Sequence, residues 1–230
     1  MKTALITGAY RGLGLEIARQ LGQKGFRVFI TGRKPDLLDT AVARLRSEGL
    51  EVHPLPLDVT NVTSILYALA VLEEQQVRLD VLINNAALRL DAEFGILDVP
   101  FGMIEQTLRT NAIGPLVVTQ RLLPVLAEKA RVINISSSAG KMSDGLYPWA
   151  PVYAISKTAL NAVTLQLATA LGERDIAVNA VCPGWVRTEM GGQEAPRSVE
   201  QGVDTVVWLA TEAPHSLRGK FWRDREEIDW

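Results

Sequence analysis

The feature that most constrains the fold is a regular alternation along the chain. Short apolar runs rich in β-branched residues alternate with longer stretches whose apolar residues recur with a period near 3.6. The short runs predict buried strands and the longer stretches predict amphipathic crossover helices, which is the order of βαβ units around a parallel sheet. The predicted strands span residues 3–7, 27–31, 51–57, 80–84, 131–136 and 176–182.

Helix ends are marked by residues that commonly stop or start helices. Gly25 and Gly49 each follow an amphipathic stretch, where glycine is a frequent C-cap. Thr60 or Asn61 is the expected N-cap of a third helix. The first helix is predicted from about residue 12 to 24 and the second from near residue 36, with longer helices at about 102–128 and 151–172 and loops at 140–151 and 189–198.

Composition limits both the architecture and the partners. A chain of 230 residues, 47% hydrophobic, supports one core, so residues 1–230 are predicted to be a single domain. The net charge is −2, and the sequence contains no basic stripe or cluster. This argues against nucleic acid and membrane partners and favours a small molecule. Cys182 is the only cysteine, neither histidine has a partner at ligand spacing, and no signal peptide or membrane span is recognised. We therefore expect a cytoplasmic protein with no metal site.

A glycine-rich turn follows the first predicted strand and opens the first helix. Its glycines are spaced Gly-x-x-x-Gly-x-Gly, unlike the commoner Gly-x-Gly-x-x-Gly fingerprint. Backbone N–H groups at such a turn approach a pyrophosphate closely, and the helix N-terminus adds positive charge. The alternative is a tight turn with no ligand. The residues predicted to bind a dinucleotide here are Gly8, Tyr10, Arg11, Gly12, Leu13 and Gly14.

The choice of dinucleotide depends on the end of the second strand. An acidic residue there would bind a ribose 2′-hydroxyl and repel a 2′-phosphate, but the sequence is Ile30-Thr31-Gly32-Arg33-Lys34. Arg33 and Arg11 are two guanidinium groups suited to a phosphate. NADP(H) is therefore predicted over NAD(H), which is kept as the second choice; the alternative for Arg33 and Lys34 is a solvated pair of surface cations.

Tyr153 and Lys157 lie four residues apart on a predicted helix. A phenol with a pKa of about 10 needs a nearby cation to act as an acid–base catalyst at neutral pH, and this spacing supplies one. In isolation, the same pair is often only a surface contact. Other polar loops leave the carboxyl ends of the predicted strands, where open α/β sheets bind ligands: Asn84-Asn85-Ala86-Ala87, Ser136-Ser137-Ser138 and the run 183–188.

Taken in order, these motifs resemble the classical short-chain dehydrogenase/reductase family over essentially the whole chain. The motifs that carry the resemblance are Thr7-Gly8-x-x-x-Gly12-x-Gly14, Asp58-Val59, Asn84-Asn85-Ala86, Asn111, the serine run, Tyr153-x-x-x-Lys157 and Pro183-Gly184. The resemblance implies a Rossmann-type, doubly wound parallel sheet in a single α/β domain.

The resemblance also implies roles at the reacting end. Tyr153 would donate a proton to a substrate carbonyl, Lys157 would hold the nicotinamide ribose and lower the phenol pKa, and Asn111 would hold a water linked to the lysine. Ser137 would orient the carbonyl, because the family motif Ser-x-x-Gly matches Ser137 and Gly140; Ser138 is the reserve.

Further cofactor contacts follow from the same resemblance. The implied contacts are Asp58 and Val59 with adenine, Asn84 and Ala86 with the adenosine ribose, Val186 and Thr188 with the carboxamide, and Pro183 and Gly184 in the same loop. Three of these residues also have a purely structural alternative: a strand-end cap for Asp58, a core position for Val186 and a helix N-cap for Thr188.

The C-terminal third is most similar to the carbonyl reductase branch. Tyr147, Trp149 and Trp185, with Ser138, are predicted to form the substrate wall, although ordinary loop packing explains the aromatics equally well. The expected activity is NADPH-dependent, reversible reduction of a ketone or aldehyde. A non-enzymatic NADP(H) sensor and an epimerase or dehydratase of the extended branch are the alternatives. The two long helices suggest a homodimer.

Overall fold

The computed structural model describes residues 1–143 and 145–230, and within them eight strands form one sheet. The strand order is β3-β2-β1-β4-β5-β6-β7-β8, and every neighbouring pair is parallel except β7 with β8. This is the predicted doubly wound sheet, with its topological switch point between β1 and β4. The strands are β1 (Thr3–Ile6), β2 (Arg27–Gly32), β3 (Val52–Pro56), β4 (Leu79–Asn84), β5 (Leu126–Ile135), β6 (Ala177–Val181), β7 (Phe221–Arg223) and β8 (Glu226–Ile228).

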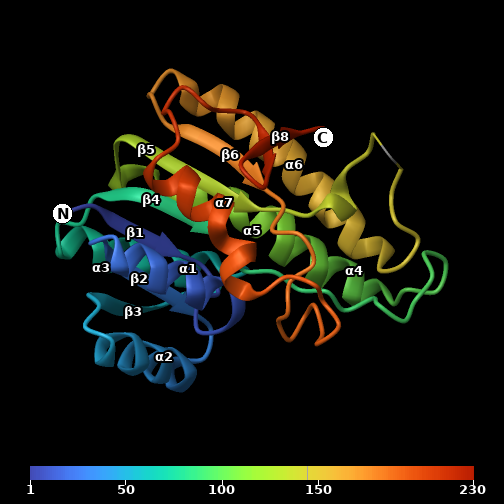
Figure 1. Cartoon of the computed structure of the whole chain (residues 1–230), viewed down its shortest axis with the longest axis horizontal. Helices are drawn as coiled ribbons and strands as arrows, with labels where there is room; N and C mark the ends of the chain where they lie inside the picture. Colours follow the sequence, from blue (N-terminus) through green and yellow to red (C-terminus); the bar gives the residue numbers. More distant parts are fainter. Residues whose placement is uncertain (144) are drawn as a thin grey trace.

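Helices cover both faces of the sheet and close two cores. One core joins α1, α2 and α7 to side chains such as Ile6 and Ile83, and the other joins α3, α5 and α6 to Leu5 and Leu82. Figure 1 shows α1 and α7 lying across the near face. Alternate residues of β1 and β4 thus enter opposite cores, as strands buried on both sides require. The helices are α1 (Gly12–Gln23), α2 (Pro35–Ser47), α3 (Val62–Glu74), α4 (Phe101–Leu108), α5 (Gly114–Leu122), α6 (Pro151–Gly172) and α7 (Val199–Thr211).

Several predicted ends of elements are confirmed. Gly25 and Gly49 each have φ of +80° just beyond α1 and α2, a conformation that glycine adopts without steric cost. The side chain of Asn61 accepts a hydrogen bond from the backbone N of Ser64, so Asn61, and not Thr60, caps α3. Helix α6 has the predicted bounds.

The single helix predicted over 102–128 is wrong. Helix α4 passes into a π-helical turn, η1 (Arg109–Ile113), before α5 begins, and a 3₁₀ turn, η2 (Leu123–Val125), leads directly into β5. Pro124 has no N–H to continue the helix, which explains the early end. Strand β5 accordingly starts at Leu126, five residues before the predicted start.

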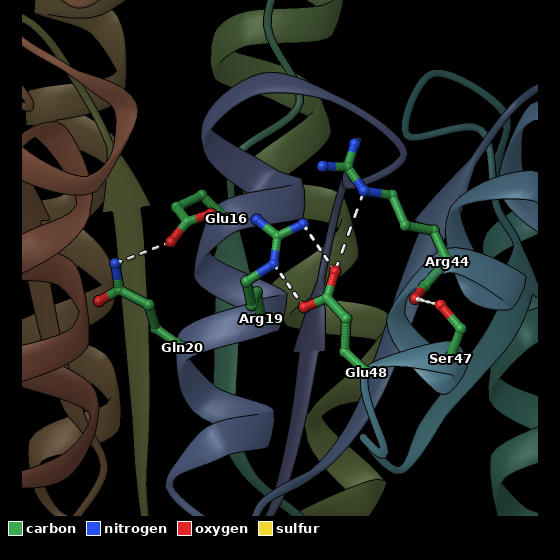
Figure 2. A network of polar contacts seen from close by, with 6 residues as sticks. All are labelled: Glu16, Arg19, Gln20, Arg44, Ser47 and Glu48. Carbon is green, nitrogen blue, oxygen red and sulfur yellow. Dashed lines mark hydrogen bonds and ion pairs between the residues drawn. The ribbon is translucent and has the colours of Figure 1, made fainter.

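An ion-pair network holds α1 against the end of α2. Nε and Nη2 of Arg19 donate to the two carboxylate oxygens of Glu48 over 2.7 and 3.1 Å, and Arg19 also pairs with Glu16 (Figure 2). Arg44 approaches the same Glu48 carboxylate at 3.9 Å. The two helices that leave β1 and β2 are therefore linked through side chains as well as through the core.

The C-terminal strands β7 and β8 were not predicted, because three-residue strands carry too short a pattern to recognise. Their turn holds Asp224 and Arg225 at φ of +54° and +62°. Trp222 donates from Nε1 to the side-chain oxygen of Asn179 over 3.1 Å, which fixes β7 beside β6. The final residue, Trp230, stacks on Phe221 with ring centroids 5.3 Å apart. The C-terminal segment of β7 and β8, with its charged residues 223–227, thus extends the sheet beyond β6.

Candidate active site

A cleft of about 1350 Å³ lies at the carboxyl ends of the parallel strands, across the switch point. Its walls come from the loops after β1, β2, β3, β4, β5 and β6 and from the start of α6. The sequence-predicted residues that line it are Gly8, Tyr10, Arg11, Gly12, Leu13, Arg33, Asp58, Val59, Ala86, Ser137, Ser138, Tyr147, Trp149, Tyr153, Lys157, Pro183, Gly184, Trp185, Val186 and Thr188.

The glycine turn needs glycine for identifiable reasons. Gly8 has φ of +62°, and a Cβ there would lie 2.9 Å from the Cα of Ala86. Gly12 has φ of +57°. Gly14 does not line the cleft; a Cβ there would lie 2.6 Å from Nδ2 of Asn85. Gly14 therefore serves the packing of α1 against the β4 loop, while Gly8 and Gly12 shape the turn that faces the cleft.

Two arginines lie at the end of the cleft formed by the β1 and β2 loops. Arg33 lines it directly after β2, and Arg11 lies 5.5 Å from the ring centroid of Tyr10 and pairs with Glu189 across the cleft. Asp58 accepts hydrogen bonds at Oδ1 from the backbone N and the hydroxyl of Thr60, over 2.9 and 2.7 Å. Asp58 thus caps its own turn, the alternative that the sequence left open, and also faces the cleft.

Asn84 does not face the cleft. Its side chain is buried and donates to Oδ1 of Asn134 over 2.8 Å and to Oγ1 of Thr119 over 3.2 Å, inside the sheet. The neighbouring Asn85, for which no separate role was predicted, lines the cleft and donates to the backbone oxygens of Thr7 and Gly8 over 2.8 and 3.0 Å. Asn85 therefore ties the β4 loop to the glycine turn.

Tyr153 and Lys157 lie on successive turns at the start of α6 and meet the serine run. The side chain of Ser137 lies close enough to the Tyr153 hydroxyl to lower its pKa, and Oγ of Ser137 accepts from the backbone N of Ala139 over 3.1 Å. Nζ of Lys157 lies 5.5 Å from the Tyr153 ring centroid and donates to the backbone O of Ile135 over 2.8 Å. The phenol, the serine and the ammonium thus converge at one end of the cleft.

Burial dominates the titration of this pair. It raises the pKa of Tyr153 to about 12, against a smaller lowering by Ser137, and it lowers the pKa of Lys157 to about 8. The sequence predicted a lowered phenol pKa, so the direction found is the opposite. The reason is burial, which removes water from the phenolate and outweighs the lowering effects of Ser137 and of the Arg89 charge.

Asn111 occupies the π-helical turn η1 and is fully buried. Its Oδ1 accepts from the backbone N of Leu88 over 2.7 Å, and its Nδ2 donates to the backbone O of Leu88 over 2.7 Å and to Oγ of Ser156 over 2.9 Å. These bonds fix the β4 loop against α6. Asn111 does not itself line the cleft, and its predicted link to a water stays a prediction.

Asp91 is a residue of the site that the sequence reasoning missed. It is fully buried, and Oδ2 accepts from the backbone N of Val152 over 2.6 Å and of Tyr153 over 3.2 Å. A distant carboxylate therefore caps the first turn of α6 and fixes the helix at the position of Tyr153. No local pattern around Asp91 signals this contact.

The three aromatic residues predicted to form the substrate wall line the cleft, and their contact with a substrate stays a prediction. Tyr147, Trp149 and Trp185 are about half exposed, and the first two have ring centroids 6.0 Å apart. The indole Nε1 of Trp185 donates to the backbone O of Gly191 over 2.7 Å, which ties this wall to the 189–198 segment. Cys182 is buried as predicted, and its Sγ accepts from the backbone N of Ser138. Residue 144 of the 140–151 loop lies outside the described residues.

The sequence profile of the short chain dehydrogenase family matches residues 2–198. The chain belongs to this family. A carbonyl reductase of Sus scrofa whose name specifies NADPH is 31% identical over 100% of this chain and 94% of its own length. A ketoacyl reductase of Streptomyces coelicolor, named as putative, is 37% identical over 82% of this chain and 72% of its own length.

Solved structures agree with the family and the fold. The NADPH-bound carbonyl reductase from chicken fatty liver superposes with a TM-score of 0.90 at 30% identity, over 100% of this chain and 99% of that one. The carbonyl reductase Sniffer of Drosophila melanogaster has a TM-score of 0.90 at 27% identity, with full coverage of both chains. These comparisons confirm the Rossmann-type fold and the likeness to the carbonyl reductase branch. Among the residues described, no helix has the length and apolarity needed to cross a membrane.

Proposed function

We propose that this chain reduces a ketone or aldehyde to an alcohol with NADPH and that Tyr153 donates the proton to the carbonyl oxygen. The observation that carries the proposal is that Tyr153, Lys157 and Ser137 line one cleft that is large enough for a dinucleotide, with Nζ of Lys157 5.5 Å from the Tyr153 ring centroid. The likeness to carbonyl reductases over the full chain supports the same reaction class.

The residues along the cleft fit NADPH. Gly8 and Gly12, both at positive φ, leave the start of α1 open to a pyrophosphate, and no side chain of the described residues caps that helix end. Arg33 and Arg11 supply positive charge for a 2′-phosphate, so NADP(H) is preferred over NAD(H). When bound, NADPH supplies the hydride for the reduction.

The side chains at the reacting end have complementary tasks. The hydroxyl of Ser137 donates a hydrogen bond to the substrate oxygen and orients the carbonyl. The Tyr153 hydroxyl transfers its proton to the oxygen as the alkoxide develops, and the ammonium of Lys157 stabilises the phenolate left behind. A Tyr153 pKa of about 12 keeps the phenol protonated at neutral pH, which favours the reductive direction. The reverse oxidation needs the phenolate and is expected to gain from higher pH.

Substitution of Tyr153 tests the proposal directly. NADPH consumption is followed at its near-ultraviolet absorbance with aromatic, quinone and aliphatic carbonyls, for the unaltered chain and for Tyr153→Phe. We expect turnover that the substitution abolishes while NADPH binding is retained. Binding without turnover on any substrate, with no difference in the variant, would favour the sensor function instead. Among the uncharged carbonyls of the panel, comparable kcat/KM is expected from a half-exposed aromatic wall.

A homodimer through the two long helical regions and a cytoplasmic location remain proposals. Large apolar side chains are exposed on these regions, which supports the first: Phe101, Ile113, Ile155 and Leu165. Light scattering of the unaltered chain and of a Leu165→Glu variant tests it, since a dimer that uses this face becomes a monomer in the variant.

A further inference from the structure

Arg89 lies in the loop after β4 and lines the cleft. Its guanidinium carbon is 5.7 Å from the ring centroid of Trp149, and its Nη2 donates a hydrogen bond to the backbone O of Met190. The side chain is half-buried. One cation therefore reaches from the aromatic wall at Trp149 to the segment that begins after Thr188.

The charge of Arg89 has no carboxylate partner in residues 1–143 and 145–230; its contacts there are Met190 and Trp149. Asp91, two residues along the chain, forms no ion pair with Arg89 among the described residues: its Oδ2 accepts from the backbone N–H groups of Val152 and Tyr153, and its buried Oδ1 has no hydrogen-bond partner there. A guanidinium offers five N–H donors, of which Met190 takes one. Partial burial of an unpaired cation is unfavourable, and an anionic ligand reverses that cost.

Arg89 also lies near the reacting hydroxyl. Its charge lowers the pKa of Tyr153, although burial has the larger and opposite effect. The same cleft is lined by the rings of Tyr147 and Trp149, whose faces suit a flat molecule. A substrate of this shape would present a carbonyl to Tyr153 at one end and an anionic group to Arg89 at the other.

We propose that Arg89 binds a carboxylate of the substrate, so that the site prefers aromatic aldehydes and ketones bearing a carboxylate over neutral compounds of the same shape. The inference rests on the carbonyl reduction proposed above and names the substrate class for that site. A guanidinium matches a carboxylate with two parallel hydrogen bonds, and the Trp149 ring supports its face without using the N–H donors.

A matched pair of aldehydes tests the preference. The ratio of kcat/KM for 4-formylbenzoate to that for neutral 4-formylbenzamide is measured in the unaltered chain, Arg89→Met and Arg89→Lys. Comparing this ratio between the unaltered chain and each variant cancels the different intrinsic reactivity of the two aldehydes. We expect Arg89→Met to lower the ratio by about 10- to 100-fold, the range for a charge-assisted hydrogen bond, and Arg89→Lys to lower it less. An equal loss for both aldehydes, or no change, overturns the proposal and assigns Arg89 to holding the loop at Met190.

A binding measurement separates this inference from the proposed function. Tryptophan fluorescence reports binding of 4-formylbenzoate and 4-formylbenzamide to the chain in the presence of NADP⁺, where reduction does not occur. Carboxylate binding that weakens in Arg89→Met and with added salt supports the inference even if neither aldehyde is reduced by NADPH, a result that would refute only the reductase function. Equal affinity for both aldehydes overturns the inference. Arg78→Met is the matched control, because Arg78 also donates to one backbone oxygen, that of Pro124, but lies outside the cleft.

Discussion

Lys157 is expected to make stability depend on pH in the free protein. The side chain is 2% exposed, and burial lowers its pKa from 10.5 to about 8, against a smaller opposing effect of Cys182. Between these pH values the unfolded chain holds the proton and the folded chain does not, so the free energy of unfolding rises with pH. At about 1.4 kcal/mol per pH unit, the lowered pKa of Lys157 reduces the free energy of unfolding by about 3 kcal/mol below pH 8. Above pH 10.5 this reduction is absent.

The substitution Lys157→Met removes this titration. Urea unfolding of both chains, without cofactor, is followed by circular dichroism at intervals from pH 7 to pH 10. We expect the stability of the unaltered chain relative to Lys157→Met to rise by roughly 2 to 3 kcal/mol over this range. The range stops at pH 10 because Tyr153 begins to lose its proton there in the unfolded chain. Its pKa in the folded chain is raised to about 12, so above pH 10 this group lowers the free energy of unfolding as pH rises. Lys2→Met, at an exposed lysine, is the control. Parallel pH profiles for the unaltered chain and Lys157→Met would refute the reasoning.

Three further substitutions test the packing and the charge around the cleft. Gly140→Ala places a Cβ 2.5 Å from the backbone carbon of Lys157 and is expected to cost about 1–3 kcal/mol in urea unfolding, whereas Gly102→Ala, with open space around it, serves as the harmless control. Asp91→Ala leaves two backbone N–H groups of α6 without an acceptor and is expected to cost about 2 kcal/mol, and Asp91→Asn less; equal losses would show that the hydrogen bonds are not what matters. Arg33→Ala is expected to raise the KM for NADPH about tenfold with little change for NADH, and an equal change for both would remove Arg33 from the 2′-phosphate site.

Most of the architecture could be predicted because it depends on local patterns. Strands β1 to β6, the glycine ends of α1 and α2 and the whole of α6 follow from periodicity and from residues with strong conformational preferences, such as Gly25 and Gly49. The prediction of one helix over 102–128 was wrong because the apolar periodicity continues through a π-helical turn and up to Pro124, where the regular helix does not. Apolar spacing alone does not record where the backbone hydrogen bonds change partner.

The sequence by itself determined the alternation of strands and helices, the glycine turn and the pairing of Tyr153 with Lys157, because each depends on residues close together in the chain. Only the tertiary structure decided which neighbours those residues have. It turned Asn84 into the sheet and Asn85 toward the glycine turn, and it brought Asp91 to the first turn of α6 and Arg89 to Trp149. It also reversed the expected pKa direction of Tyr153. Burial and long-range contacts arise only when distant segments pack, so no spacing in the sequence encodes them.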